Sequence, residues 1–473
     1  MSEDNGWSRL KRGYRGLKSD MEAPVPDDES EISRKKRRFA VIVVFGVVMA
    51  FIAFLISISI SSGGVISISD AIAALFSAVG KALASSEEIA ANPAAYQMTT
   101  VELYIYESRL PRTIAAIAVG AGLSVAGCMY QAIIRNPLVD PYITGVSSGA
   151  GCFAIAVVAL GITIPLIPNS SLYLIPVAAI LGGLIAFAIT MVVAEGSGGS
   201  ATNYILAGTI VGFAFSSVQT IFLTLSLDNI QNTMWWLYGS FANVTWENAW
   251  LVFVPVMILS IVAMLWAREY NLFMMGEEQA KQLGLNVKRF KRLMLVLASV
   301  ITALCVAFCG IIGFVGLIIP HACRMALGSD YRLVMPASMV LGAMLMLFAD
   351  LLARTVLSPQ ELPVGAITAI IGTPIFAYML MRRGRQYDGR RGSEGRGPPH
   401  EVRGLRGAEG RELHHGQGQD GRADRAQRLR EVHADEVHLQ DQRHDLRVRV
   451  RGRQRHQGPE AIRGGQARRH RPG

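Results

Sequence analysis

The sequence predicts an all-α polytopic membrane protein with about ten transmembrane helices, and three observations support this. Hydrophobic residues make up 51% of the 473 residues, charged residues only 17%, and the mean hydropathy is +0.33. A soluble domain carries about 25% charged residues. The charges are also concentrated in residues 1–38, in one internal loop and after about residue 382. Long apolar runs separate these regions, and such runs are typical of segments that cross a bilayer.

Ten apolar runs approach the length of about 20 residues that a helix needs to cross the hydrocarbon core. In chain order they cover about 39–61, 111–134, 146–164, 172–195, 204–227, 248–267, 291–312, 313–327, 333–352 and 363–382. The run at 313–327 is the shortest and is interrupted by Pro320. The first run is too long for the apolar part of a signal peptide and lacks a clear cleavage site. We therefore interpret it as the first transmembrane helix.

The charges of the loops predict the orientation. The basic segment 33–38 directly precedes the first helix and places the N-terminus in the cytoplasm by the positive-inside rule. Alternation then places the loops 61–110 and 228–247 outside and the loop 268–290 inside. With its flank at Arg292, this third loop holds six basic and three acidic residues, whereas 228–247 holds no basic residue. Ten crossings return the C-terminus to the cytoplasm, which predicts a multi-pass protein of the cell membrane.

The chemistry-bearing residues argue against several classes of site. All five cysteines lie in apolar segments without a CxxC pair, and His321 is the only histidine before the tail. We therefore expect no metal site of Cys and His and no cofactor bound by this chain. The net charge of +10 does not indicate nucleic-acid binding, because in a membrane protein basic residues report which loops face the cytoplasm.

The loop after the first helix contains a pattern that predicts a short amphipathic helix. Five apolar residues recur there at helical spacing: Ile72, Leu75, Phe76, Val79 and Leu83. Such a helix could lie on the membrane surface. A mere tether is the alternative.

Two arginines, Arg109 and Arg112, begin a Gly- and Ala-rich helix at its outer end, where the positive-inside tendency disfavours them. Small residues allow close packing of helix backbones in a membrane. The arginines could be anchors that reach the headgroups, or they could form a rim of cations that captures carboxylates on an external partner.

The end of the same helix contains an irregular segment. Pro137 and Pro141 break any helix, and a Gly/Ser-rich run, 145–151, follows. Irregular backbone at membrane depth survives only beside protein or a water-filled cavity. The segment is either a loop beside a translocation path or a simple turn.

The predicted cytoplasmic loop 268–290 contains a short helix. Glu277 and Glu278 fill its first turn, where the helix dipole favours acids, and Gly284 is placed to end it. Ala280 and Leu283 share one face by spacing. A short helix between two spans indicates a docking element for a soluble partner, and a solvated connector is the alternative.

Ionisable residues inside apolar runs form a further group: His321, Arg324, Asp350 and Arg354. Such residues are costly in a membrane and mark function or pairing. Asp350 and Arg354 are four residues apart, so an ion pair within one helix is one interpretation. A membrane-embedded enzyme that uses His321, Asp350 and Arg354 is another, although the predicted topology places His321 and Arg354 at opposite membrane faces.

Together these segments resemble the FecCD-like family, the iron-siderophore and cobalamin-type permeases of ATP-binding-cassette (ABC) importers. The resemblance covers about 39–383 and rests on four strings: RLPRTIAAIAVGAGLSVAGCMYQAIIRNPLVDPYITGVSSGA, MGEEQAKQLGLNV, GFVGLIIPHACRMALGSDYR and FADLLARTVLSPQELPVGAITAIIGTPIFAYML. It implies a type II ABC importer permease architecture, which is a homodimer with the pathway at the dimer interface. It also implies two ATPase subunits, which bind ATP and Mg²⁺, and an extracytoplasmic substrate-binding protein.

The resemblance also implies roles for particular residues. Binding-protein docking falls on Arg109, Arg112 and Arg354. Coupling to the ATPase falls on Gly276, Glu277, Glu278, Ala280, Leu283 and Gly284. The translocation path or gate is assigned to Asn136, Pro137, Gly145, Ser147 and Gly149. The chain is then expected to perform no covalent chemistry and to pass iron(III)-siderophore complexes, with cobalamin or haem as further substrates. A passive channel is a competing hypothesis.

Both ends of the chain fall outside this resemblance. Residues 1–38 are polar and predict a disordered cytoplasmic arm, and residues 384–473 form a low-complexity tail. From Asp388 onward the tail holds 20 Arg and eight His but only one Ile and one Ser, a composition that cannot bury a core. Back-translation of residues 425–436 permits a reading, one base forward, of GPNGSGKSTLMK, which contains an ATPase phosphate-binding loop. The tail is therefore interpreted as a misread neighbouring ATPase gene, and the nucleotide sequence tests this.

Overall fold

The computed structural model describes residues 28–61, 64–163, 170–225, 234, 236–358 and 360–394. The described chain is helical apart from connecting loops and two antiparallel two-residue strands, β1 (Ile60–Ser61) and β2 (Gly64–Val65). The predictions for residues 1–27 and for the tail beyond residue 394 lie outside these described residues.

Each of the ten predicted spans corresponds to a helix. These are α2 (Asp28–Ser59), α6 (Leu110–Ile133), α7 (Val146–Ala159), α8 (Ser170–Gly196), α9 (Ala201–Leu225), α11 (Trp246–Leu265), α14 (Val287–Cys309), α15 (Val315–Leu327), α16 (Tyr331–Thr355) and α17 (Val364–Glu394). Seven described helices are long and apolar enough to cross a membrane, and α7, α15 and the apolar part of α17 are shorter. The predicted all-α polytopic fold class is confirmed.

The outermost helices extend beyond the predicted spans. Helix α2 begins at Asp28, inside the segment 1–38 that was expected to be disordered, and α17 continues past residue 383 to Glu394. The physical reason is that a helix does not need to end at the membrane boundary. In the extension of α2, Arg, Lys and Glu are good helix formers, and they extend a helix that the apolar run has already nucleated. The extension of α17 contains Gly384, Gly389 and Gly392, and helix propensity does not explain it.

Shorter helices connect the spans: α3 (Ile68–Ala82), α4 (Ser86–Ala91), α5 (Thr100–Tyr104), η1 (Ile105–Arg109), η2 (Pro141–Thr144), α12 (Ala267–Met275) and α13 (Glu277–Gln282). Helix α3 confirms the predicted amphipathic helix. Its residues Ile72 and Leu75 pack against a small core formed with α2, whereas Phe76 and Leu83 are exposed. Its position on a membrane surface stays a prediction.

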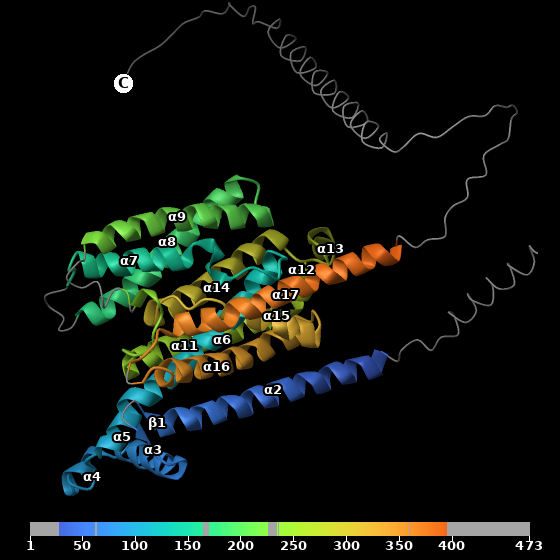
Figure 1. Ribbon diagram of the computed structural model, residues 1–473. Coiled ribbons are helices and arrows are strands. Elements are labelled where there is room, and N and C mark those ends of the chain that lie inside the picture. The colour runs from blue at the N-terminus through green and yellow to red at the C-terminus, as the bar shows by residue number, and fades with distance from the viewer. Residues whose placement is uncertain are drawn as a thin grey trace, which may run out of the picture. The chain divides into compact units, whose positions relative to one another are not determined.

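Helix α6 lies at the centre of the bundle and packs against α11, α14, α15 and α16 (Figure 1). Of its 24 residues, 21 are buried. Glycines bring the backbones together, because a Cβ on Gly127 would lie 1.9 Å from the Gly316 carbonyl oxygen and one on Gly120 would lie 2.2 Å from that of Gly342. The small residues predicted for packing therefore bring α6 into backbone contact with α15 and α16.

Helices α7, α8 and α9 pack on one another and lie on the side of the bundle away from α2 (Figure 1). Close contact again depends on glycine, because a Cβ on Gly149 of α7 would lie 2.3 Å from the Gly182 carbonyl oxygen of α8. Helix α14 contacts both this group and α6, so it joins the group to the central part of the bundle.

Candidate functional site

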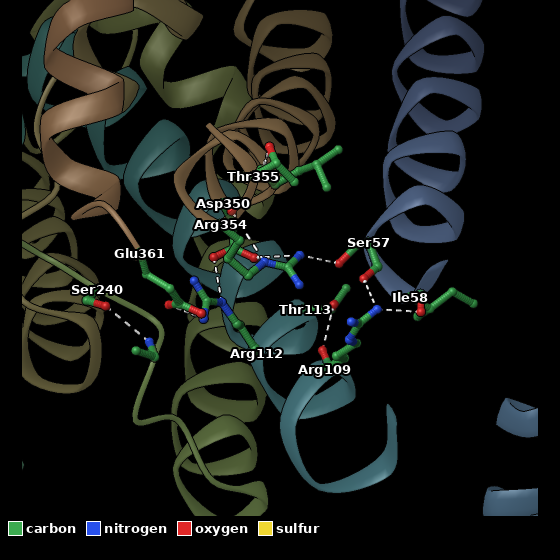
Figure 2. Close-up of polar contacts among 12 residues, drawn as sticks. Ser57, Ile58, Arg109, Arg112, Thr113, Ser240, Asp350, Arg354, Thr355 and Glu361 are labelled. Atoms are coloured by element: carbon green, nitrogen blue, oxygen red, sulfur yellow. Dashed lines mark hydrogen bonds and ion pairs between the residues drawn. The ribbon is translucent and has the colours of Figure 1, made fainter. Parts of the chain in front are cut away.

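Five charged residues gather at the end of the bundle where α6 begins, and we call them the arginine cluster: Arg109, Arg112, Asp350, Arg354 and Glu361. Figure 2 shows these side chains, which come from η1, α6, α16 and the loop between α16 and α17. The C-terminal turn of α2 borders the cluster and contributes Ser57 and Ile58.

Arg112 joins the two acids of the arginine cluster. Its Nε donates to Asp350 Oδ1 at 2.7 Å, and its Nη1 donates to Glu361 Oε2 at 2.8 Å. The side chains of Arg112 and Asp350 are 6% and 2% exposed, whereas that of Glu361 is 29% exposed. Charge-assisted hydrogen bonds of this length are strong. Arg112 therefore fixes the start of α6 to α16 and to the loop that follows α16.

Arg109 holds the end of α2. Its Nη1 donates to the carbonyl oxygens of Ser57 at 2.9 Å and Ile58 at 2.5 Å. The last carbonyl groups of a helix have no partner within the helix, and a cation there also complements the helix dipole. The guanidinium lies 4.7 Å from the ring centroid of Tyr104, which adds a cation–π contact.

Arg354 completes the arginine cluster from α16. Its Nη2 lies 3.2 Å from Asp350 Oδ2 and donates to Ser57 Oγ at 2.5 Å. The ion pair within one helix that the four-residue spacing suggested is therefore present. Arg354 also bonds α16 to α2, a contact that sequence spacing does not reveal.

The arginine cluster carries one more cation than anion, because arginine stays protonated in proteins. Its surplus donors are buried. Within the described residues, Nε and Nη2 of Arg109 and Nη2 of Arg112 have no hydrogen-bond partner. Such groups are costly to bury and call for an explanation. An additional acceptor, such as a carboxylate from another molecule, would satisfy them.

The burial of the arginines corrects the expected arrangement. The sequence suggested a rim of exposed cations, but Arg109 and Arg112 are only 1% and 5% exposed. The physical reason is that Asp350 and Glu361, far along the chain, fold back onto Arg112, whereas the end of α2 covers Arg109. The position of Glu361 beside a buried helix end is not predictable from sequence spacing. The docking role of Arg109, Arg112 and Arg354 stays a prediction.

Helix α13 lies near the other end of α6, since Arg135, just after α6, contacts the helix that precedes α13. The 24 residues of α6 make it about 36 Å long. As predicted, Glu277 and Glu278 occupy the first turn of α13, and Gly284 follows its end with a left-handed φ of +90°. The Glu278 carboxylate, 2.7 Å away, raises the pKa of Lys281.

The two apolar residues of α13 do not share one exposed face. Ala280 is fully buried, whereas Leu283 is 59% exposed. This corrects the expectation that both present themselves to a partner. Leu283 lies at the C-terminal cap of α13, where the helical spacing ends. Of the predicted coupling residues, Glu278, Leu283 and Gly284 are exposed and Gly276 and Glu277 are partly exposed. Gly276 begins the helix with φ +135°, and the coupling role of these residues stays a prediction.

Arg135 links the end of α6 to α12, a contact that sequence spacing does not reveal. Its Nη2 donates to the Phe273 carbonyl oxygen at 2.8 Å, and its guanidinium lies 4.5 Å from the Phe273 ring centroid. Phe273 is in the last turn of α12, directly before α13. The contact therefore joins the end of α6 to the residues directly before α13.

The irregular segment after α6 packs inside the chain. Asn136 Oδ1 accepts the amide of Leu138 at 3.0 Å and closes the turn around Pro137. Gly145 has φ +78°, and a Cβ on it would lie 3.3 Å from the Gly208 carbonyl oxygen. Ser147 is 8% exposed. Gly145 and Gly149 therefore bring α7 against α9 and α8 within one chain, and the role of these five residues in a pathway stays a prediction.

Polar side chains satisfy a second irregular segment, between α14 and α15. Tyr142 Oη donates to the carbonyl oxygen of Ile312 at 2.9 Å and lies 3.1 Å from the Ile312 amide nitrogen. At the start of α15, Gln131 Nε2 donates to the carbonyl oxygens of Gly316 and Leu317, each at 3.2 Å, and Gln131 Oε1 accepts from Arg324. Irregular backbone inside a membrane needs such partners.

The described residues contain no group of three or more His, Cys, Asp or Glu side chains placed to hold a metal ion. Asp350 and Arg354 belong to the arginine cluster. His321 lies on α15.

Comparisons with known proteins agree with this architecture. The model of the FecCD transport family matches residues 44–382, more than half of the chain. The uncharacterized ABC transporter permease protein YvrB of Bacillus subtilis is 39% identical over 278 residues, which are 59% of this chain and 78% of that protein. The vitamin B12 import system permease protein BtuC of Klebsiella pneumoniae is 38% identical over 60% of this chain and 84% of its own length.

Two further comparisons extend the agreement. The cobalamin import system permease protein BtuC of Halobacterium salinarum is 38% identical over 60% of this chain and 75% of its own length. A solved inward-facing structure of a transporter described as metal-chelate ABC type is 29% identical, with a TM-score of 0.60 over 72% of this chain and 99% of that chain. The chain therefore belongs to the FecCD transport family, as a membrane-embedded permease of ABC importers of the metal-chelate or cobalamin type.

Proposed function

We propose that this chain is the permease subunit of an importer that takes up iron(III)-siderophore complexes across the cell membrane. The observation that carries the proposal is the pair of sites joined by α6. One is the buried arginine cluster with surplus donors, and the other is the short acidic helix α13. Membership of the FecCD transport family supports a transport role for this pair.

In the proposed assembly, two copies of the chain form a homodimer with the pathway between them. Two ATPase subunits bind the cytoplasmic face at α13, and both chain termini lie on that side. An extracytoplasmic substrate-binding protein docks at the opposite face. ATP and Mg²⁺ bind the ATPase subunits, and this chain contributes no catalytic group.

The arginine cluster supports docking of an acidic protein surface. A carboxylate would satisfy the unpartnered donors of Arg109 and Arg112 and would offset the surplus positive charge. Access runs past Glu361 and Arg354, whose side chains are 29% and 11% exposed. Docking would then affect the packing of α2, because Arg109 and Arg354 also bind the end of α2.

Helix α13 supports docking of the ATPase. ATP-driven closure of the ATPase pair would move α13, and the contact between Arg135 and Phe273 would transmit this movement to α6. Because α6 is packed into α15 and α16 through glycine contacts, it would move as a rigid element. The movement of α6 would then displace the arginine cluster, which lies at the far end of that helix.

The test of docking compares two matched variants. Glu278 of α13 and Glu87 of α4 both lie in the first turn of exposed six-residue helices. We expect Glu278→Lys to lower ATPase binding and ATP-driven uptake in proteoliposomes about tenfold or more, because a like-charge or unpaired contact costs over 1 kcal/mol. Glu87→Lys should leave both unchanged. Equal uptake by both variants would contradict the docking role of α13.

Cobalamin is the second candidate substrate, and one observation favours it. Two relatives at 38% identity are named as vitamin B12 or cobalamin import permeases. Uptake of labelled iron-siderophore, cobalamin and haem by the same proteoliposomes, each with its binding protein, decides between them. ATP-driven uptake of cobalamin alone would replace the siderophore proposal and leave the importer intact.

A further inference from the structure

Helix α3 carries an exposed face in addition to the face that packs against α2. Four exposed residues recur along it at helical spacing, and we call them the apolar stripe: Ala73, Phe76, Gly80 and the capping residue Leu83. Phe76 and Leu83 are 73% and 80% exposed, which are the highest values among the large apolar residues of the described chain. The stripe therefore offers a surface of apolar and small residues to whatever surrounds α3.

The two charged residues within Ile68–Ala82 lie away from the apolar stripe. With 3.6 residues per turn, Asp70 and Lys81 are about 120° or more around the helix axis from Phe76. Lys81 instead faces α5, where its Nζ donates to Glu102 Oε2 at 2.7 Å. The side of a helix that faces water typically carries polar and charged residues, so the composition of the stripe disfavours contact with water.

The connection to α2 places α3 at the end of a membrane span. The apolar span in α2 ends at Ser59, and the β1–β2 hairpin turns the chain back at once. The Ile66 amide donates to the Ser59 carbonyl oxygen at 2.9 Å. Helix α3 then packs against the last turns of α2 through a small core that contains Ile58 and Ala71 (Figure 1). It therefore lies where α2 leaves the apolar layer of the bilayer.

Aromatic residues indicate the same depth. Helix α3 contacts η1, and the Tyr106 ring of η1 lies 5.0 Å, between centroids, from the Trp246 ring at the start of α11. Trp250, one turn further along α11, stacks on Trp246 at 6.3 Å and is 50% exposed. Tyr and Trp are enriched at the headgroup level of membranes. The element on which α3 packs therefore lies at that level.

We propose that the apolar stripe of α3 inserts into the surface of the bilayer, with Phe76 and Leu83 among the acyl chains nearest the headgroups. Interfacial helices bury their apolar face about 5–10 Å into this boundary. In the described chain, similar exposed fractions of 71–72% occur at Val192, Phe213 and Leu265, which lie on helices apolar enough to span a membrane. The inserted helix would fix the end of α2 and η1 at the membrane surface.

The test measures the depth of nitroxide labels on the full chain in proteoliposomes. Phe76→Cys and Leu83→Cys report on the apolar stripe, and Ile89→Cys is the control. Ile89 is 41% exposed and belongs to α4, a helix with two acids and no buried residue. The five native cysteines are buried, so the unchanged chain gives the labelling background. We expect depths of about 5–10 Å for the first two labels and a label in water at the control position.

Collisions with oxygen and with a nickel chelate distinguish the environments. Oxygen should reach the two labels of the stripe and the chelate should not, whereas the control label should be open to the chelate. Equal access of the chelate to all three labels would show that the stripe faces water and would overturn the proposal. Exclusion of both reagents from the stripe would show that protein covers it, from a partner or a second copy, and would overturn the proposal as well.

A second set of variants tests whether burial of the apolar stripe holds the helix in place. Gly80→Cys carries the label, because a Cβ there meets nothing within 4 Å. Adding Phe76→Glu and Leu83→Glu should move this label from the bilayer into water, since carboxylates are costly to bury. Adding Ile89→Glu should leave its depth unchanged. An equal depth in both backgrounds would contradict the proposal, and circular dichroism verifies that each variant is helical.

Discussion

The ion pair between Arg112 and Asp350 offers the sharpest test of the arginine cluster as a buried structural unit. Both side chains are almost fully buried, and Asp350 accepts from Arg112 at 2.7 Å and from Arg354 at 3.2 Å. Asp350→Leu leaves three arginines with Glu361 as their one remaining acid in the cluster. Breaking a buried pair in this way costs about 3–5 kcal/mol. We therefore expect the free energy of unfolding to fall by about that amount.

Arg112→Met should cost less than Asp350→Leu. Asp350 keeps its contact with Arg354, and Glu361 is partly exposed and can be hydrated. We expect a loss near the lower limit, about 3 kcal/mol. The double variant replaces both charges with apolar side chains and leaves no unpaired charge between these two positions. The two substitutions should therefore be less than additive, with a coupling energy of about 2–3 kcal/mol.

The assay is the free energy of unfolding of the chain in bicelles, measured by steric trapping for the single and double variants. An exposed pair serves as the control, because Lys281 and Glu278 lie 2.7 Å apart with side chains 53% and 82% exposed. The same cycle on this pair should give a coupling energy below about 0.5 kcal/mol. Additive losses at Arg112 and Asp350, or single losses below about 1 kcal/mol, would refute the reasoning.

Three further predictions concern helix packing, hydrogen bonds to the backbone, and the pH dependence of stability. Gly127→Ala should destabilise the chain by about 3 kcal/mol or more, because its Cβ would lie 1.9 Å from a backbone oxygen. The control Gly80→Ala should be neutral or stabilising, because a Cβ there meets nothing within 4 Å. Thermal unfolding compares the two variants. Tyr142→Phe removes both hydrogen bonds to Ile312 and should cost about 1–3 kcal/mol by the same assay, and an unchanged midpoint would show that water replaces the hydroxyl. Hydrogen bonds from Lys81 and Ser77 lower the pKa of Glu102 from 4.5 to about 2, so stability should fall as pH falls from about 4.5 to about 2. Glu102→Gln should remove this fall, and a pH series of unfolding midpoints that is the same for both proteins would contradict the assignment.

The sequence was sufficient to predict the membrane helices. Each apolar run has a length set by the bilayer, and that length is a local property of the chain. Even the short run with Pro320 corresponds to a helix, α15. The helix ends were less predictable, as α2 begins at Asp28, because charged residues that form helices well carry no signal for a membrane boundary.

The arrangement of the arginine cluster could be predicted only in part. The pair of Asp350 and Arg354 follows from helical spacing. The contacts of Arg112 with Asp350 and Glu361 join residues more than 200 positions apart, and they depend on the loop after α16 folding back. In that loop the Leu362 amide donates to the Ala353 carbonyl oxygen at 2.8 Å. Such a contact has no signature in local spacing.

The glycine contacts of α6 could also be predicted only in part from the sequence. The small residues of α6 predicted close helix packing, but they did not identify the partners. Gly127 meets Gly316 and Gly120 meets Gly342 only because α15 and α16 cross α6 at those positions. Likewise, the burial of Ala280 beside an exposed Leu283 reflects packing of α13 on its neighbours, which residue type alone does not determine.

The central claim is that the chain is a transport subunit driven by an ATPase, and one measurement tests it most directly. Proteoliposomes containing the chain with its ATPase are supplied with labelled iron(III)-siderophore and the substrate-binding protein, with and without ATP. We predict uptake that requires ATP, the ATPase and the binding protein together. Equal flux without ATP would identify a passive channel and would contradict the account.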